Sequence, residues 1–131
     1  MRLVNARCER VLATTVELAT SRAERRRGLL GRTELADGHA IVIAPCFAVH
    51  TIGMEFAIDV VFVDARGRVR KITRDLRPWR IAAAPAATAV IELAAGALVP
   101  SEALSIGDRL YLDPPPPDIR AIAAFAASRS H

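Results

Sequence analysis

The stretch that decides the fold is Pro45–Asp64, PCFAVHTIGMEFAIDVVFVD. Its second half, Phe56–Val63, is apolar at every position except Asp59, and this predicts a strand buried on both faces. Alternation along the strand places Asp59 on the same face as Val61 and Val63. A lone ionised carboxylate in such a strand costs several kcal/mol unless donors or a cation meet it.

Asp59 therefore implies a partner, and two interpretations of it are open. As a structural anchor, it would accept hydrogen bonds that hold the preceding loop, with the Thr51–Gly53 amides as nearby donors. As a functional group, it would orient His50, pair with an arginine or hold a ligand cation. We favour the structural anchor.

Three further residues of this stretch, Cys46, His50 and Met54, follow one another at intervals of four. A thiolate, an imidazole and a thioether together would suit a soft metal ion. A cysteine near a histidine could also be an activated nucleophile. A single C-x-x-x-H pair lacks the further ligands of a zinc site. We therefore predict no metal and no cofactor, with these residues as weak candidates.

Composition limits the class of protein. The chain has 131 residues, of which 52% are hydrophobic, as expected for one folded domain. No run of eighteen apolar residues predicts a membrane span, and the N-terminus lacks the apolar segment of a secretory signal. Two cysteines fit a reducing compartment. We expect a cytoplasmic location.

The net charge of +4 comes almost entirely from arginine, since Lys71 is the sole lysine. One basic cluster is Arg25–Arg27, which could form a solvated face or an anion-binding rim. A nucleic-acid binder should combine such charge with exposed aromatic residues, and this chain has one Trp, one Tyr and four Phe. These features argue against a nucleic-acid partner. Trp79, beside Arg80, could cover a pocket or plug the end of the core.

The order of elements is predicted from local patterns. Ser21 and Glu24 form an S-x-x-E capping box, which predicts a short helix from Arg22 to about Leu30 that Gly31 ends. The expected strands are 11–18, 39–44, 56–63, 68–74, 88–93 and 109–112. The charged strand 68–74 fits a sheet edge. We divide the chain into a β-rich domain, residues 1–113, and a Pro-rich spacer with an Ala-rich tail, residues 114–131.

Several motifs occur in an order that resembles a known family. They are Arg27-Gly28-Leu29-Leu30-Gly31-Arg32, His50-Thr51-Ile52-Gly53-Met54, Asp59-Val60-Val61-Phe62-Val63-Asp64, Ile91-Glu92-Leu93 with Gly96, and Gly107-Asp108. Over about residues 9–113 the chain resembles DUF192, a family of uncharacterised bacterial and archaeal proteins.

The resemblance implies an α+β fold, a mostly antiparallel sheet curled into a half-open barrel with one or two short helices, and no established activity. The chain has Leu30 where the family usually has Met, Ala57 where it has Pro, and His50 where it has Trp. A position that accepts either Trp or His is a poor candidate for a shared metal ligand.

Our leading hypothesis is a non-catalytic small-ligand-binding or accessory domain with a pocket beside the Asp59 strand. Arg27 would contact an anion, His50 and Asp59 would orient polar groups, and Trp79 would form an apolar wall.

Two alternatives remain open. One is a small thiol enzyme with Cys46 as nucleophile, His50 as base and Asp59 as the orienting group. The other is an interaction module that docks a partner protein through the charged edge strand or the C-terminal tail.

Overall fold

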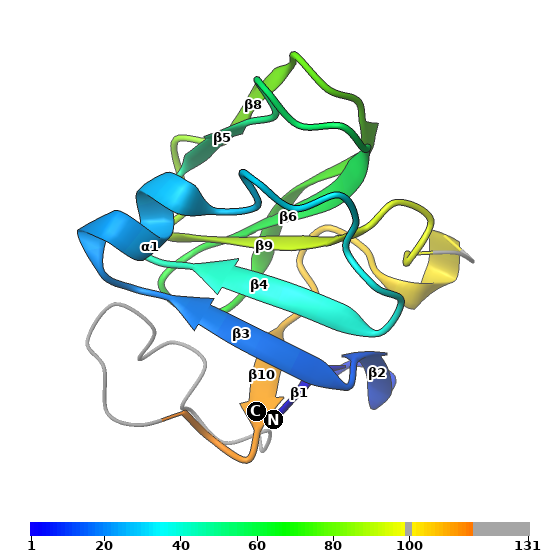
Figure 1. Ribbon diagram of the computed structural model, residues 1–131. Coiled ribbons are helices and arrows are strands. Elements are labelled where there is room, and N and C mark those ends of the chain that lie inside the picture. Colours follow the sequence, from blue (N-terminus) through cyan, green and yellow to red (C-terminus); the bar gives the residue numbers. More distant parts are fainter. Residues whose placement is uncertain (99–100, 117–131) are drawn as a thin grey trace.

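The computed structural model describes residues 1–98 and 101–116 (Figure 1). In these ranges it contains ten strands, one α-helix and one 3₁₀-helix. They are β1 (Arg2–Asn5), β2 (Arg10–Ala13), β3 (Thr15–Ala19), α1 (Arg22–Arg27), β4 (His39–Ile43), β5 (Ala48–His50), β6 (Ile58–Val63), β7 (Val69–Leu76), β8 (Ile81–Ala83), β9 (Ala89–Ala94), the 3₁₀-helix (Ser101–Ala103) and β10 (Leu110–Asp113).

A five-stranded sheet in the order β3-β4-β9-β6-β7 forms the centre of the fold. Its strands pair antiparallel except for β3 and β4, which are parallel. The predicted strand 56–63 is confirmed as β6, in which all six residues are buried. The predicted strand 88–93 is confirmed as β9, which lies between β4 and β6 and is also buried throughout.

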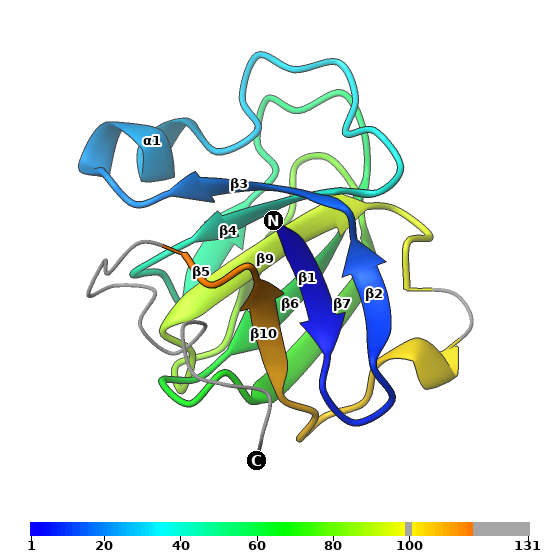
Figure 2. The ribbon, with the colours of Figure 1, turned by 90° about the horizontal axis from the view of Figure 1, so that it is seen from below.

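The two faces of this sheet are covered by different elements. On one face, the sheet β10-β1-β2 packs against the central strands, so that Leu3 and Leu110 share a core with Val61 and Ile91 (Figure 2). On the other face lie α1, the turns that follow it and the small sheet of β5 and β8 (Figure 1). Burial on both faces explains why β6 and β9 are almost entirely apolar.

The core on the second face holds the covering segments in place. Leu29, just after α1, and Met54, after β5, are buried there with Phe62 of β6 and Val90 of β9. These contacts attach the short helix and the β5 loop to the central sheet. This second layer forms the walls of the pocket described below.

The helix α1 begins as predicted and ends earlier. Ser21 and Glu24 form the capping box, in which each side chain accepts a hydrogen bond from the other residue's backbone amide. The helix ends at Arg27 because Gly28 adopts a φ of 47°, a conformation that breaks the helical path and strains any side chain. The prediction that the helix continues to about Leu30 and that Gly31 ends it was therefore wrong, because the helix is three residues shorter.

Other differences concern the sheet. The predicted strand 11–18 is two strands, β2 and β3, which belong to different sheets. The strand β1 and the short strands β5 and β8 were not predicted. The charged strand 68–74 is confirmed as β7 at one edge of the central sheet.

The fold class is confirmed at the level of a mostly β structure with few helices. The described residues form three sheets and no closed barrel. The half-open barrel stays a prediction, as does the division after residue 113. Residues 117–131 of the predicted spacer and tail lie outside the described residues. None of the helices in the described ranges has the length and apolar character needed to cross a membrane.

Asp59 is 1% exposed and accepts hydrogen bonds from three backbone amides. The donors are the amides of Asp75 at 2.9 Å, Gly96 at 3.1 Å and Leu98 at 3.4 Å. It is therefore a structural anchor, but not of the Thr51–Gly53 loop. It joins the end of β7 to the turn after β9, because its side chain faces the layer in which that turn lies.

We expect Asp59→Ala to lower the free energy of unfolding by about 3 kcal/mol, since three buried amides would lose their acceptor. Urea denaturation of the variant and the unchanged chain measures this difference. Asp37→Ala, at an exposed turn position, is the control and should change stability by less than about 0.5 kcal/mol. Equal stability of the two variants would contradict the anchoring role.

Candidate functional site

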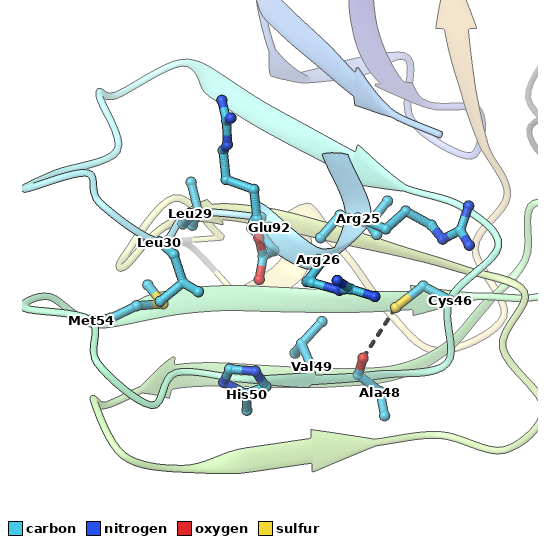
Figure 3. Close-up of a pocket in the computed structure, with 13 residues that line it drawn as sticks. Arg25, Arg26, Leu29, Leu30, Cys46, Ala48, Val49, His50, Met54 and Glu92 are labelled. Atoms are coloured by element: carbon cyan, nitrogen blue, oxygen red, sulfur yellow. Dashed lines mark hydrogen bonds between the residues drawn. The ribbon is translucent and has the colours of Figure 1, made fainter. Parts of the chain in front are cut away.

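A pocket of about 150 Å³ lies in the second layer, between α1, β5 and the central strand β9 (Figure 3). It is lined by Arg25–Leu30, Ile43, Cys46, Ala48–His50, Met54 and Glu92. The segments that line it are far apart in sequence, and the central sheet brings them together.

The end of α1 lies close to the central sheet at Gly28. A Cβ atom placed on Gly28 would lie 3.8 Å from Oε1 of Glu92. The next residue, Leu29, is 2% exposed and fixes the turn against the sheet. The end of α1 therefore lies directly over the Glu92 carboxyl group.

Glu92 is the unusual group of the pocket. It stands near the middle of β9, where its neighbours across the strand pairs are the apolar residues Ile41 of β4 and Val60 of β6. The residue is 3% exposed, and Oε1 is buried with no hydrogen-bond partner among the described residues. Figure 3 shows the carboxyl group pointing into the space between α1 and β5.

The environment of Glu92 disfavours its charged form. Burial raises the pKa of Glu92 to about 7, and the positive charge of Arg32 offsets only part of this effect. Arg32 is itself engaged elsewhere, because its guanidinium donates to both carboxylate oxygens of Glu17 at 2.8 and 2.9 Å. Near pH 7, Glu92 therefore exists both as an acid that can donate a hydrogen bond and as a carboxylate whose Oε1 lacks a partner among the described residues.

Arginines form one rim of the pocket. Arg25, Arg26 and Arg27 all come from the last turn of α1. One guanidinium nitrogen of Arg25 donates to the Thr20 carbonyl at 2.7 Å. Arg27 also lines a neighbouring cavity of about 210 Å³ on another side of the helix. The pocket thus combines a buried acidic group with a basic rim.

Cys46 and His50 line the pocket but make hydrogen bonds to other groups. The Cys46 thiol donates to the Ala48 carbonyl at 3.1 Å, and burial raises the pKa of this thiol above its ordinary value. Nδ1 of His50 accepts a hydrogen bond from the Ile52 amide at 3.3 Å. The structure therefore gives the Cys46 thiol a backbone acceptor in place of a histidine base, and its pKa moves away from thiolate formation.

The metal candidates Cys46, His50 and Met54 are brought to this pocket together. Within residues 1–98 and 101–116, no group of three or more His, Cys, Asp or Glu side chains is arranged to hold a metal ion.

The four residues predicted to line a pocket separate into two groups. Arg27 and His50 do line this one. Asp59 lies opposite Leu93 in the β6–β9 pair, and side chains alternate along a strand, so Asp59 and Glu92 point to opposite faces of the sheet. Trp79 stands on the loop between β7 and β8, is 65% exposed, and is not among the lining residues. The pocket therefore lies across the sheet from Asp59, and Trp79 forms no wall of it.

Sequence reasoning missed Glu92 as a site residue. The segment Thr88–Leu93, TAVIEL, contains one carboxylate in an otherwise apolar strand, which is the same signal that singled out Asp59. In the sequence, Glu92 stood out only as a member of the motif Ile91-Glu92-Leu93, which supports the family resemblance. The argument that a buried carboxylate needs a partner applied equally to both residues.

Comparison with known protein families identifies the family of this chain. The DUF192 family, described as "Uncharacterized ACR", matches residues 4–112. The chain belongs to this family. No curated protein matches the chain significantly.

Two solved structures resemble this DUF192 chain. One is a candidate transcription regulator from Sinorhizobium meliloti 1021, with 28% identity, a TM-score of 0.71, and coverage of 83% of this chain and 88% of that one. The other is a protein of unknown function from Novosphingobium aromaticivorans DSM 12444, with 27% identity, a TM-score of 0.64, and coverage of 74% of each chain.

We expect the pKa of Glu92 to make stability depend on pH. Its pKa is about 7 in the folded chain and 4.5 without burial. The folded state therefore binds more protons between these values. The contribution of Glu92 is most favourable below pH 4.5 and declines by about 3 kcal/mol as the pH rises through about 7.

Glu92→Gln removes this titration and keeps the shape of the side chain. Urea denaturation of both proteins from pH 4.5 to 8 should give a difference curve that favours the variant increasingly as the pH rises. A difference that stays constant with pH would show that Glu92 does not carry the raised pKa.

We also expect slow alkylation of Cys46. With Cys8, the exposed free thiol, replaced by serine, the pH midpoint of the Cys46 reaction should lie above that of an ordinary thiol. Reaction with iodoacetamide across a range of pH measures this midpoint. A midpoint near neutral pH that moves upward in His50→Ala would contradict this expectation and favour the thiol enzyme.

Proposed function

We propose that this DUF192 chain is a small-ligand-binding domain and that its ligand enters the pocket over Glu92. One observation carries the proposal: a carboxyl oxygen is buried in the wall of a pocket and has no hydrogen-bond partner in the part of the chain that the structure describes. Buried polar atoms are almost always paired, and each exception requires an explanation. A ligand that donates a hydrogen bond to Oε1 would supply the missing partner.

The size and lining of the pocket support a small organic ligand. A cavity of about 150 Å³ is known to accept a molecule of the size of benzene, and this pocket has a similar volume. Leu29, Val49 and Met54 supply apolar surface, while Glu92 and the arginine rim supply a few polar groups. Apolar walls with a few well-placed polar groups are typical of ligand sites.

The residues named from sequence take revised roles in this proposal. Arg27 contacts an anionic part of the ligand, and His50 presents a polar group at the β5 side. Asp59 acts from the opposite face, where it holds the turn after β9. The partner is a small molecule, and the raised pKa of the Cys46 thiol supports binding without catalysis. The Sinorhizobium relative is described as a candidate regulator, and binding of an effector would suit that role.

A second candidate function is docking of a partner protein. Three large apolar side chains near the β5–β8 sheet are exposed: Phe47 by 57%, Trp79 by 65% and Ile81 by 71%. The three side chains belong to this small sheet or to residues within two positions of it, and exposed apolar surface often marks an interaction site. Docking through the charged edge strand or the C-terminal tail stays a prediction.

The decisive experiment fills the pocket. Val49→Trp places a large ring at a lining position, and Ile81→Trp makes a matched change on the paired strand, outside the lining. Both variants and the unchanged chain are screened by amide NMR against a library of small polar fragments. Their melting temperatures establish that all three are folded.

We expect fragments to shift the amides of residues 25–30 and 48–50 in the unchanged chain and in Ile81→Trp. Affinity in Val49→Trp should fall at least tenfold, because the ring occupies the space of the ligand. If no fragment shifts these amides, or if Val49→Trp binds as well as the control, the pocket is not a ligand site.

A further inference from the structure

The pocket has opposite charges at its two ends. At the inner end, Glu92 stands between apolar residues of β4 and β6, and its Oε1 has no hydrogen-bond partner within residues 1–98 and 101–116. At the outer end, Arg25–Arg27 form the rim, and the one acidic residue of α1, Glu24, is occupied by the amides of Thr20 and Ser21. Figure 3 shows Arg26 on the side of the Glu92 carboxyl group that faces Cys46.

Each end selects a different chemical group. A buried carboxylate is stabilised most by a cationic donor, which neutralises its charge as well as filling its lone pairs. A neutral donor would leave the buried charge uncompensated. Conversely, the arginine rim disfavours a ligand that carries only positive charge, and guanidinium groups bind carboxylates and phosphates well.

Between the two ends the walls are apolar. Leu29, Leu30, Val49 and Met54 line this space, and Figure 3 shows Leu30 beside Met54, with Val49 on the β5 side. A ligand that spans from Glu92 to the rim would therefore place a short hydrocarbon segment against these side chains.

We propose that the pocket binds small zwitterions, with a primary ammonium group on Glu92 and a carboxylate or phosphate group at the arginine rim. This inference rests on the proposed function and specifies the class of its ligand. Amino acids and ω-amino acids are the simplest members of the class, and the length of the hydrocarbon segment selects among them.

Ligand binding of this kind is coupled to loss of a proton. The pKa of about 7 for Glu92 means that the empty pocket is half protonated near neutral pH, whereas an ammonium group requires the ionised carboxylate. Affinity should therefore fall about tenfold from pH 8 to pH 6. A ligand that accepts a hydrogen bond from protonated Glu92 would show the opposite dependence.

The other titratable groups around Glu92 are few, so variants can show which of them causes the dependence of affinity on pH. The neighbouring positions on β4 and β6 are apolar. The charged or titratable groups that face the pocket from other elements are Arg25–Arg27, Arg32 beyond them, Cys46 and His50. Histidine is the side-chain type that most often changes charge near neutral pH, so His50→Gln serves as a control.

The test uses a matched set of probes: ω-aminoalkanoates of two to six carbons, each with the alkylamine and the alkanoate of the same length. Dissociation constants are measured by calorimetry and by amide NMR. The corresponding ω-aminoalkylphosphonates show which anion the rim prefers. Variants are Glu92→Gln, Arg26→Gln and Arg27→Gln, with Arg22→Gln as a control on the same helix outside the pocket lining.

We expect at least one aminoalkanoate to bind tenfold or more tightly than both of its single-charge analogues. In Glu92→Gln, the aminoalkanoate should no longer bind more tightly than the alkanoate, and its affinity should no longer depend on pH. Arg26→Gln or Arg27→Gln should remove the advantage over the alkylamine. Arg22→Gln should change neither advantage, and His50→Gln should keep the dependence on pH.

Two results overturn the inference, and they differ in what they say about the pocket. If other fragments bind and are lost in Val49→Trp, while the zwitterions show no advantage or Glu92→Gln leaves it intact, the ligand class is wrong and the pocket remains a ligand site. If neither the fragments nor the zwitterions bind in a way that Val49→Trp abolishes, the proposed function fails as well.

Discussion

The constraint on which this structure depends is the cost of placing a carboxyl group in the central sheet. The sheet contains two buried carboxyl groups, Asp59 and Glu92, on neighbouring strands and on opposite faces. Asp59 accepts hydrogen bonds from three backbone amides and thereby joins the end of β7 to the turn after β9. Oε1 of Glu92 has no hydrogen-bond partner among the described residues, and burial raises the pKa of this carboxyl group. The first group stabilises the fold, whereas the second leaves an unmet interaction in the wall of a pocket.

The pocket over Glu92 exists because the second layer is thin and locally open. A six-residue helix, a two-stranded sheet and the turns between them cover this face, and Leu29 and Met54 attach them to it. Gly28 ends the helix and brings its last turn close to Glu92 without adding a side chain. The same geometry sets the arginines of α1 at the rim of a pocket whose inner acidic group, Glu92, belongs to β9.

Much of the fold could be predicted from local patterns. The buried strands β6 and β9, the edge strand β7 and the capping box of α1 each have a strong signal in the residues themselves. The prediction failed where pairing partners decide the outcome. Residues 11–18 look like one strand, but the chain changes from one sheet to another near Thr14, and the short strands β5 and β8 exist only because they pair with each other.

The sequence by itself determined that two carboxylates would lie in apolar strands, that Cys46, His50 and Met54 would share one loop region, and that arginines would cluster after Ser21. Only the tertiary structure decided which of these groups meet. Alternation fixes the face of a side chain within its own strand, but strand order and register decide what covers that face. For this reason Asp59 and Trp79 lie away from the pocket, and Glu92 stands in its wall.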